Sequence, residues 1–245
     1  MAANAPSVLV ERRDAIAVVT LNRPGRRNGV TTQMCEQLYD VLHTLAAEDA
    51  RVVVLRGAGD DFSVGADLGA SREAMAAPDL TQMSHIYHAS TMLHTMPQVT
   101  IAAIDGGCAG ASMGWASACD LRFASDRARF STAFLKVGVS GDMGLAWSLV
   151  RLIGAAKARE LLFFSEKITA TQALKLGLVT RLFTAEALHA AVLTLAEQLA
   201  GRNPIALQMM KANLVSAELL GFHDYVEIES ARHLQCMASS VFARK

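Results

Sequence analysis

The sequence predicts an α/β domain with a helical C-terminal part, and three observations carry this prediction. Residues 52–55 are a continuous apolar run and residues 99–104 are apolar except for Thr100, as expected for strands buried on both faces. Stretches with helical apolar spacing separate such runs, and from Asp142 onward the pattern is mostly helical. The 245 residues, 52% of them hydrophobic, are long enough for one substantial core.

The individual elements can be assigned in order along the chain. Two β-rich runs, 8–11 and 16–21, form a hairpin with Arg13-Asp14 at the turn, and Thr31 or Thr32 caps a helix that runs to about residue 47. Residues 57–69 form a loop, and a helix spans residues 80–95. Small residues at 106–114 lead into another helix. Further strands are expected at 121–124, around Phe130 and at 179–183, with breaks at Gly154, Gly177, Asn203-Pro204 and Gly221.

Charge and cysteine content narrow the range of partners. Lys+Arg and Asp+Glu both number 23, so a balanced surface gives no reason to expect a nucleic-acid or membrane partner. The four cysteines are scattered, without the spacing of a metal site, which favours reduced thiols in a cytoplasmic protein. The chain also shows no signal-peptide pattern and no apolar run of membrane-spanning length.

Two glycine-containing turns, 62–68 and 104–114, are the strongest candidates for chemistry. The second directly follows the predicted buried strand at 99–104, and the first follows the strand at 52–55. Two backbone N–H groups that point at one oxygen would form an oxyanion hole. Taken alone, such a turn more often reflects only tight packing.

These turns resemble segments of the crotonase (enoyl-CoA hydratase/isomerase) family. F-S-V-G-A-D-L at 62–68 is similar to the family's F-x-A-G-A-D-L, and residues 104–120 are similar to I-N-G-x-A-x-G-G-G-x-x-L-A-x-x-C-D. L-N-R-P at 21–24 with Arg27-Asn28 resembles L-N-R-P-x-x-R-N-A-L. Segments 128–130, 151–154 and 173–179 match in the same order, so the resemblance covers nearly the whole chain.

The resemblance implies a crotonase-type spiral of ββα units over residues 1–185 and a helical oligomerisation region over 186–245. It implies an acyl-CoA thioester substrate and a homotrimer or homohexamer. No metal is expected, and no cofactor other than the CoA that arrives as part of the substrate.

The resemblance also assigns site residues. Ala66 and Ala111 would supply the two oxyanion-hole N–H groups, with Ala111 standing where the family more often has glycine. Backbone near Arg27 and along residues 64–68 would bind CoA. The expected substrate- and CoA-binding residues are Arg27, Asn28, Val30, Val64, Gly65, Ala66, Asp67, Leu68, Gly110, Ala111 and Phe134.

The catalytic carboxylates depart from the family pattern. Hydratases of the family use two glutamates, and the corresponding positions here are Gly114 and Phe134. Asp142 falls where some isomerases of the family carry a catalytic aspartate. A single carboxylate suffices to move a proton from C2 to C4 of a 3-enoyl thioester. On the residues alone, Asp142 is better interpreted as the N-cap of a helix that begins at Met143. The resemblance favours catalysis.

The function is therefore expected to be a double-bond shift in an enoyl-CoA, with Asp142 as the proton shuttle. Enoyl-CoA hydration and non-catalytic acyl-CoA binding remain alternatives. Gly110–Gly114 also fits G-x-S-x-G, so a serine hydrolase using Ser112 is a further alternative, although no histidine occurs between His94 and His189. The acyl group, the pathway and the choice of trimer or hexamer stay open, as does whether Phe242 and Lys245 form a shortened CoA-closing segment.

Overall fold

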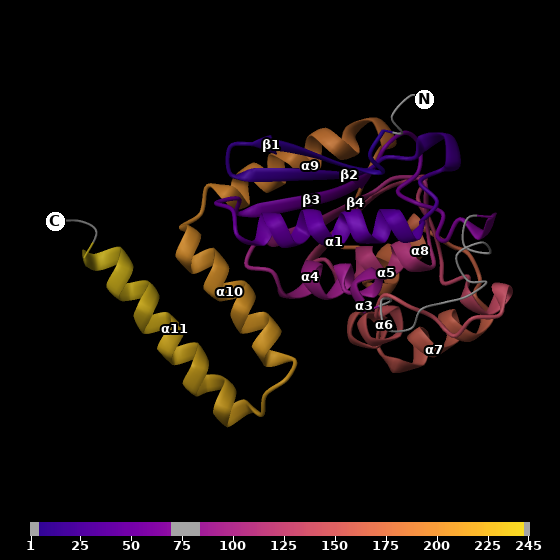
Figure 1. Ribbon diagram of the computed structural model, residues 1–245. Helices are drawn as coiled ribbons and strands as arrows, with labels where there is room; N and C mark the ends of the chain where they lie inside the picture. Colours follow the sequence, from indigo (N-terminus) through magenta and orange to yellow (C-terminus); the bar gives the residue numbers. More distant parts are fainter. Residues whose placement is uncertain (1–4, 70–83, 243–245) are drawn as a thin grey trace.

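A parallel sheet forms the centre of the computed structural model, which describes residues 5–69 and 84–242 (Figure 1). It has six strands in the order β1-β2-β3-β4-β6-β9. Only β1 and β2 are antiparallel, and the other neighbours run parallel. The strands are β1 (Val8–Arg13), β2 (Ile16–Leu21), β3 (Val52–Gly57), β4 (Val99–Ile104), β6 (Leu121–Ser125) and β9 (Arg181–Phe183).

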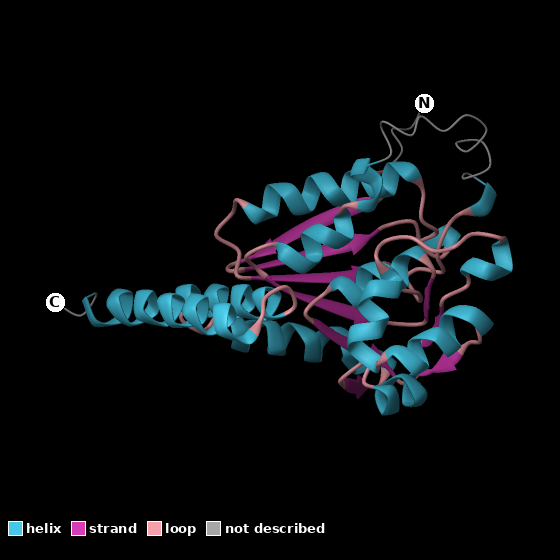
Figure 2. Ribbon diagram, turned by 90° about the horizontal axis from the view of Figure 1, so that it is seen from below, coloured by secondary structure: helices cyan, strands magenta, loops and turns pink. Residues whose placement is uncertain are grey.

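Helices cover both faces of this sheet because its strands are apolar on both sides. Along β2, Ala17 and Val19 pack with α1 (Thr32–Ala46), whereas Ile16 and Val18 pack with α9 (Ala185–Ala200). This alternation follows from the two-residue period of a strand. The sheet between its two helical layers is seen in Figure 2. The predicted α/β class is therefore confirmed.

A smaller sheet and a group of helices lie beyond the carboxyl ends of β3 and β4. The sheet joins β5 (Gly107–Ala109), β7 (Arg129–Ser131) and β8 (Ile168–Thr169). The helices nearest to it are α5 (Ala111–Ala118), the short 3-10 helix η2 (Phe134–Val137), α6 (Leu145–Ile153), α7 (Ala155–Phe164) and α8 (Ala170–Leu176). The sequence did not predict β5 or β8, because strands of three and two residues are too short to show a period.

The last two helices, α10 (Pro204–Ala217) and α11 (Phe222–Phe242), form a hairpin that projects from the body (Figures 1 and 2). Lys211 of α10 anchors it: the ammonium is 2.9 Å from the Asp120 carboxylate and donates to the carbonyls of Leu93 and Gln98. The predicted boundary at residue 186 falls at the start of α9, which packs on the sheet, and only the helices after Ala200 project.

Three other local predictions differ from the structure. The helix expected over 80–95 consists of α3 (Ser84–Tyr87) and α4 (Ala89–Thr95), separated at His88, and residues 80–83 lie outside the described part. The strand at 179–183 begins only at Arg181. The first hairpin turns at Asp14-Ala15, since Arg13 still pairs with Ile16 and Asp14 takes a positive φ. Lys245 also lies outside the described residues. In the described part, no helix is long and apolar enough to cross a membrane.

Candidate active site

One parallel backbone bridge brings the glycine-containing turns together, and a second joins Val30 to Ala66 of the first turn. Ser63 pairs with Cys108: its N–H donates to Gly107 at 2.9 Å, and its carbonyl accepts from Ala109 at 3.1 Å. Ala66 and Ala111 each lie three residues beyond this pair. Gly65 permits the approach, since a Cβ at that position would lie 2.8 Å from the carbonyl oxygen of Ala109. The two segments therefore run side by side at equal offset.

The N–H groups of Ala66 and Ala111 are both left without a partner among the described residues. Ala111 is the first residue of α5, where a backbone N–H has no intrahelical acceptor. Ala66 lies between the two residues that bond to Val30. The Gly65 carbonyl accepts from the Val30 N–H, and the Asp67 N–H donates to the Val30 carbonyl, each at 2.8 Å. In such a parallel bridge, the residue between the two bonded ones, here Ala66, has its N–H pointing away from the partner segment. Two free donors on adjacent segments suit an oxyanion, and the positive end of α5 adds to this preference.

Asp142 lies in the loop between η2 and α6 and has an unusual environment for a carboxylate. Its Oδ1 is buried and has no hydrogen-bond partner in the structure. Burial raises the pKa of Asp142 from 3.8 to about 6. The capping interpretation is wrong, because α6 begins at Leu145 behind Gly144 and no side chain caps it. In the described part of the chain, the Asp142 side chain thus caps no helix and leaves Oδ1 unpaired.

A cavity of about 550 Å³ opens beside Asp142. Phe134 lies between this cavity and the second glycine-containing turn: Cβ atoms placed on Gly110 and Gly141 would lie 3.7 and 3.5 Å from its ring. The described residues that line the cavity are Tyr87, Phe134, Ser140, Gly141, Asp142, Met143, Gly144, Leu145, Ala146, Trp147 and Leu162. Asp142 is the one carboxylate among them. Tyr87 and Leu162 had no sequence signal, because only the fold places α3 and α7 at this cavity.

The position of the first family glutamate is closed by packing. A Cβ on Gly114 would lie 2.5 Å from the Cβ of Met143 and 3.1 Å from its carbonyl oxygen. Met143 is itself buried, with only 4% of its surface exposed. The backbone around Asp142 therefore occupies the space that a side chain at position 114 would need.

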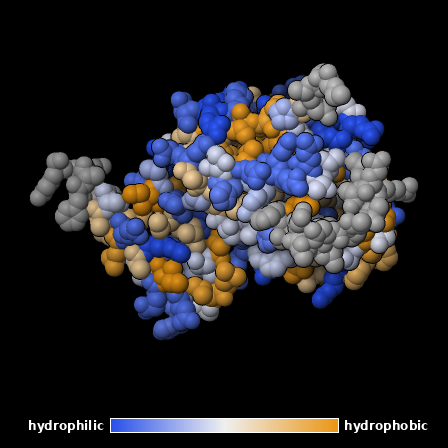
Figure 3. Space-filling model, viewed as in Figure 1, coloured by the Kyte–Doolittle hydropathy of each residue, from blue (hydrophilic) through white to orange (hydrophobic). Residues whose placement is uncertain are grey.

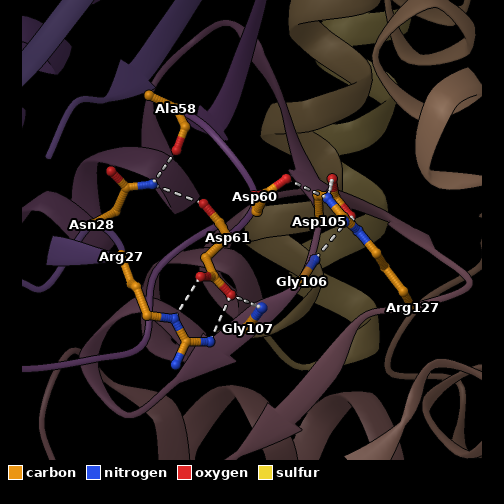
Figure 4. A network of polar contacts seen from close by, with 9 residues as sticks. All are labelled: Arg27, Asn28, Ala58, Asp60, Asp61, Asp105, Gly106, Gly107 and Arg127. Carbon is orange, nitrogen blue, oxygen red and sulfur yellow. Dashed lines mark hydrogen bonds and ion pairs between the residues drawn. The ribbon is translucent and has the colours of Figure 1, made fainter. Parts of the chain in front are cut away.

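A polar network fixes the turn that precedes the second N–H donor (Figure 4). The Arg27 guanidinium donates to both carboxylate oxygens of Asp61, at 2.7 and 3.0 Å, and Asp61 Oδ1 accepts from the Gly107 N–H at 2.7 Å. Burial opposes ionisation of Asp61, but the bonds from Arg27 and Gly107 prevail and hold its pKa below the ordinary value. Asp61 thereby links the Arg27 turn to the segment that leads to Ala111.

Arg127 completes this network, and no sequence motif pointed to it. Its guanidinium donates to both oxygens of Asp105, at 2.8 and 2.6 Å, and reaches Asp60 at 3.2 Å. Asp105 also accepts from the Gly106 N–H. The pair joins two loops that are distant in sequence.

Among the residues predicted to bind CoA, Asn28 has its side chain engaged within the protein. It is fully buried, and its amide donates to the carbonyls of Ala58 and Asp61, so the side chain holds the turn in place. A contact of its backbone with CoA stays a prediction. Val30 is also buried, with both backbone groups engaged. Of the residues predicted to bind substrate or CoA, the accessible ones are Arg27, Val64, Ala66, Asp67 and Leu68.

Ser112 cannot act as a nucleophile in this arrangement. The residue is fully buried, and its hydroxyl contacts the carbonyl oxygens of Ser63 and Ala109 at 2.8 Å each. It supports the junction of the two turns. The serine hydrolase alternative is therefore contradicted.

Comparison with known proteins identifies the family. The family model described as "Enoyl-CoA hydratase/isomerase" matches residues 11–240. The chain thus belongs to the enoyl-CoA hydratase/isomerase family, the crotonase superfamily, and is an enzyme of this kind with the predicted crotonase fold.

Two relatives and one solved structure show the range of similarity. A 4-chlorobenzoyl coenzyme A dehalogenase of Arthrobacter sp is 32% identical over 85% of this chain and 77% of its own length. The mitochondrial Delta(3,5)-Delta(2,4)-dienoyl-CoA isomerase of Mus musculus is 33% identical over 80% of this chain and 64% of its own. A Thermobifida fusca YX protein assigned as an enoyl-CoA hydratase, solved in complex with acetoacetyl-CoA, superposes with a TM-score of 0.89 at 29% identity, covering 96% of each chain.

Proposed function

We propose that the protein is an enoyl-CoA isomerase that shifts a double bond with Asp142 as its single acid–base group. The observation that carries this proposal is the half-buried Asp142, whose Oδ1 is buried and has no hydrogen-bond partner. It lines a cavity together with Phe134, whose ring lies next to Gly110, the residue before Ala111. Among the described residues, the N–H groups of Ala66 and Ala111 have no acceptor. The acyl-CoA substrate is supported by the names of the relatives and by the acetoacetyl-CoA complex of the Thermobifida fusca protein.

The reaction would proceed in two proton transfers. The thioester carbonyl oxygen accepts hydrogen bonds from Ala66 and Ala111, which stabilise the enolate formed when a proton leaves C2. Asp142 takes that proton and returns it at C4, so the 3,4-double bond moves to the 2,3-position. A pKa of about 6 suits a group that both accepts and donates a proton near neutral pH.

Hydration is a poorer fit to the same residues. Adding water across a 2,3-double bond requires activation of water together with protonation of C2. Position 114 is closed by Met143, and position 134 carries a phenylalanine that is 6% exposed. Among the described cavity-lining residues, this leaves one carboxylate for two tasks.

Dehalogenation is the second candidate, because a relative with 32% identity carries that activity in its name. An unpartnered carboxylate could attack an aryl carbon as a nucleophile and displace chloride. Release of chloride from 4-chlorobenzoyl-CoA distinguishes this reaction from a double-bond shift.

The decisive experiment compares matched 3-enoyl-CoA and 2-enoyl-CoA substrates by absorbance, using the wild type and Asp142→Asn. We expect the wild type to convert 3-enoyl to 2-enoyl ester, and the variant to lose about 100-fold or more of this rate while it still binds the ester. Hydration of the 2-enoyl ester, or full activity of the variant, would refute the proposal. Ester binding without any turnover would instead indicate a non-catalytic acyl-CoA-binding protein.

The proposed reaction needs no metal and no cofactor besides the CoA of the substrate. Activity is therefore expected to survive extensive dialysis against EDTA. Loss of activity that is restored by one added divalent metal would contradict this part of the proposal.

We further propose that the C-terminal hairpin assembles the chain into a homotrimer or homohexamer. The hairpin exposes apolar side chains over α10 and α11 (Figure 3), including Met210, Leu214, Leu219 and Phe222 at 59, 61, 75 and 84%. Apolar surface of this extent usually marks an interface. Light scattering should return a mass three or six times that of the chain, and a monomer at micromolar concentration would contradict it.

A further inference from the structure

Trp147 of α6 contributes an aromatic wall to the cavity that holds Asp142. Two more aromatic side chains, Tyr87 and Phe134, line the same cavity. Aromatic residues make up only 6% of the chain, so three at one site form a local concentration. Three aromatic side chains therefore line the cavity together with Asp142.

Two contacts hold the indole ring of Trp147 in one orientation. The Arg151 guanidinium stacks 3.7 Å from the ring centroid and donates to the Trp147 carbonyl at 3.3 Å. The His94 imidazole meets the ring edge-to-face, with centroids 5.2 Å apart at 78°. Such contacts restrict a side chain that is otherwise 41% exposed.

The second contact is itself supported by the C-terminal hairpin. His94 Nε2 lies 3.0 Å from the Glu218 carboxylate, at the end of α10. Both side chains are partly buried, with 24 and 32% exposed. A chain of contacts thus runs from Glu218 through His94 to Trp147 and ends at the cavity.

We propose that Trp147 determines acyl specificity, selecting a planar aromatic or conjugated acyl group, and that Arg151 and the His94–Glu218 pair are positioning residues for its ring. This inference rests on the proposed function in that it places the acyl group beside Asp142. A flat ligand can stack over the whole area of the indole face that Arg151 does not cover, whereas a puckered ring of similar size loses part of that contact.

The test uses a pair of thioesters that differ mainly in flatness. Benzoyl-CoA and cyclohexanecarbonyl-CoA have the same carbon count, and neither carries a double bond that the proposed reaction could move. Calorimetric titration therefore measures recognition without turnover, so its failure is distinguishable from failure of the isomerase proposal. We expect the wild type to bind benzoyl-CoA about 5- to 10-fold tighter than the cyclohexane ester.

Trp147→Leu should abolish this preference and leave the Kd of free CoA unchanged. Phe163→Leu, on an exposed aromatic of α7 outside the cavity, is the matched control and should retain the preference. Equal affinity of the wild type for the two esters, or an unchanged ratio in Trp147→Leu, would overturn the proposal.

The positioning residues are tested by the same ratio. Arg151→Gln and Glu218→Gln should each lower the preference about two-fold, and Arg151→Lys should restore part of it because the cation is kept. Trp147 is one of two tryptophans, and the other, Trp115, is fully buried. Fluorescence quenching by benzoyl-CoA should thus disappear in Trp147→Phe, and quenching that persists there would contradict the assignment.

Discussion

The Cβ of Met143 lies where a side chain on Gly114 would have to begin, with only 2.5 Å between the two positions. The residue that follows the catalytic candidate Asp142 therefore packs against a glycine in the middle of α5. The loop position that places the Asp142 carboxylate at the cavity also excludes a side chain at position 114. Gly114→Glu consequently should not create a hydratase.

Gly114→Ala tests this packing through stability. Gly to Ala inside a helix ordinarily stabilises by about 1 kcal/mol, but here the new methyl group overpacks and should destabilise by about 1–3 kcal/mol. Urea denaturation measures the free energy of unfolding. Gly221→Ala, where a Cβ meets nothing within 4 Å, is the control. In the double variant with Met143→Gly, the two losses should be less than additive, and strict additivity would contradict the contact.

The rate should depend on pH through Asp142. The base must be deprotonated to accept the C2 proton, and its pKa is raised to about 6 by burial. kcat/KM for a 3-enoyl-CoA should therefore rise about ten-fold per pH unit below this value and level off above it. A profile that stays flat between pH 5 and 7 would exclude Asp142 as the base.

Ionisation of Asp142 should also lower the free energy of unfolding. Its folded pKa of about 6 exceeds the ordinary 3.8, so the folded state binds more protons between these values and the free energy of unfolding falls as pH rises through this range. Asp142→Asn should raise that free energy at pH 7.5 by up to about 3 kcal/mol, and by less at pH 4.5. A variant that is destabilised equally at both values would contradict the desolvation argument.

Asp61→Asn should weaken the link between the Arg27 turn and Gly107. The loss of the charged bidentate pair should cost about 1 kcal/mol at neutral pH, since Arg27 is largely exposed. The pKa of Asp61 is lowered, so its contribution to the free energy of unfolding is fully present above pH 3.8 and is lost as the pH falls further. The free energies of unfolding of wild type and variant should therefore converge in acid. KM for the thioester should rise more than kcat falls. Asp60→Asn, on a carboxylate that is 89% exposed, is the control.

The sequence predicted those helices and strands whose formation depends on a local residue pattern. Neighbouring residues predicted the strand β4 and a threonine cap of α1, at Thr31 or Thr32. In the structure Thr31 is the cap and accepts from the Met34 N–H. Family motifs also placed Ala66 and Ala111 on adjacent turns. Their role as donors stays a prediction.

Other features depend on tertiary contacts that no local pattern carries. The short strand β5 exists because it pairs with β7, and Asp142 fails to cap a helix because Met143 and Gly144 both take positive φ where the loop packs on Gly114. The family motif predicted Asn28 as a CoA-binding residue. The burial of its side chain and its bonds to Ala58 and Asp61 depend on tertiary contacts.

The equal offset of Ala66 and Ala111 from the Ser63–Cys108 bridge has an evolutionary consequence. The donors are fixed by paired backbone, whereas the carboxylate sits on a separate loop rich in left-handed glycine positions. Changes of acid–base residue can thus accumulate in the loop without disturbing the donors. The same pair of backbone donors can thus be combined with different acid–base residues for different reactions. This agrees with a family whose named members include both isomerases and dehalogenases.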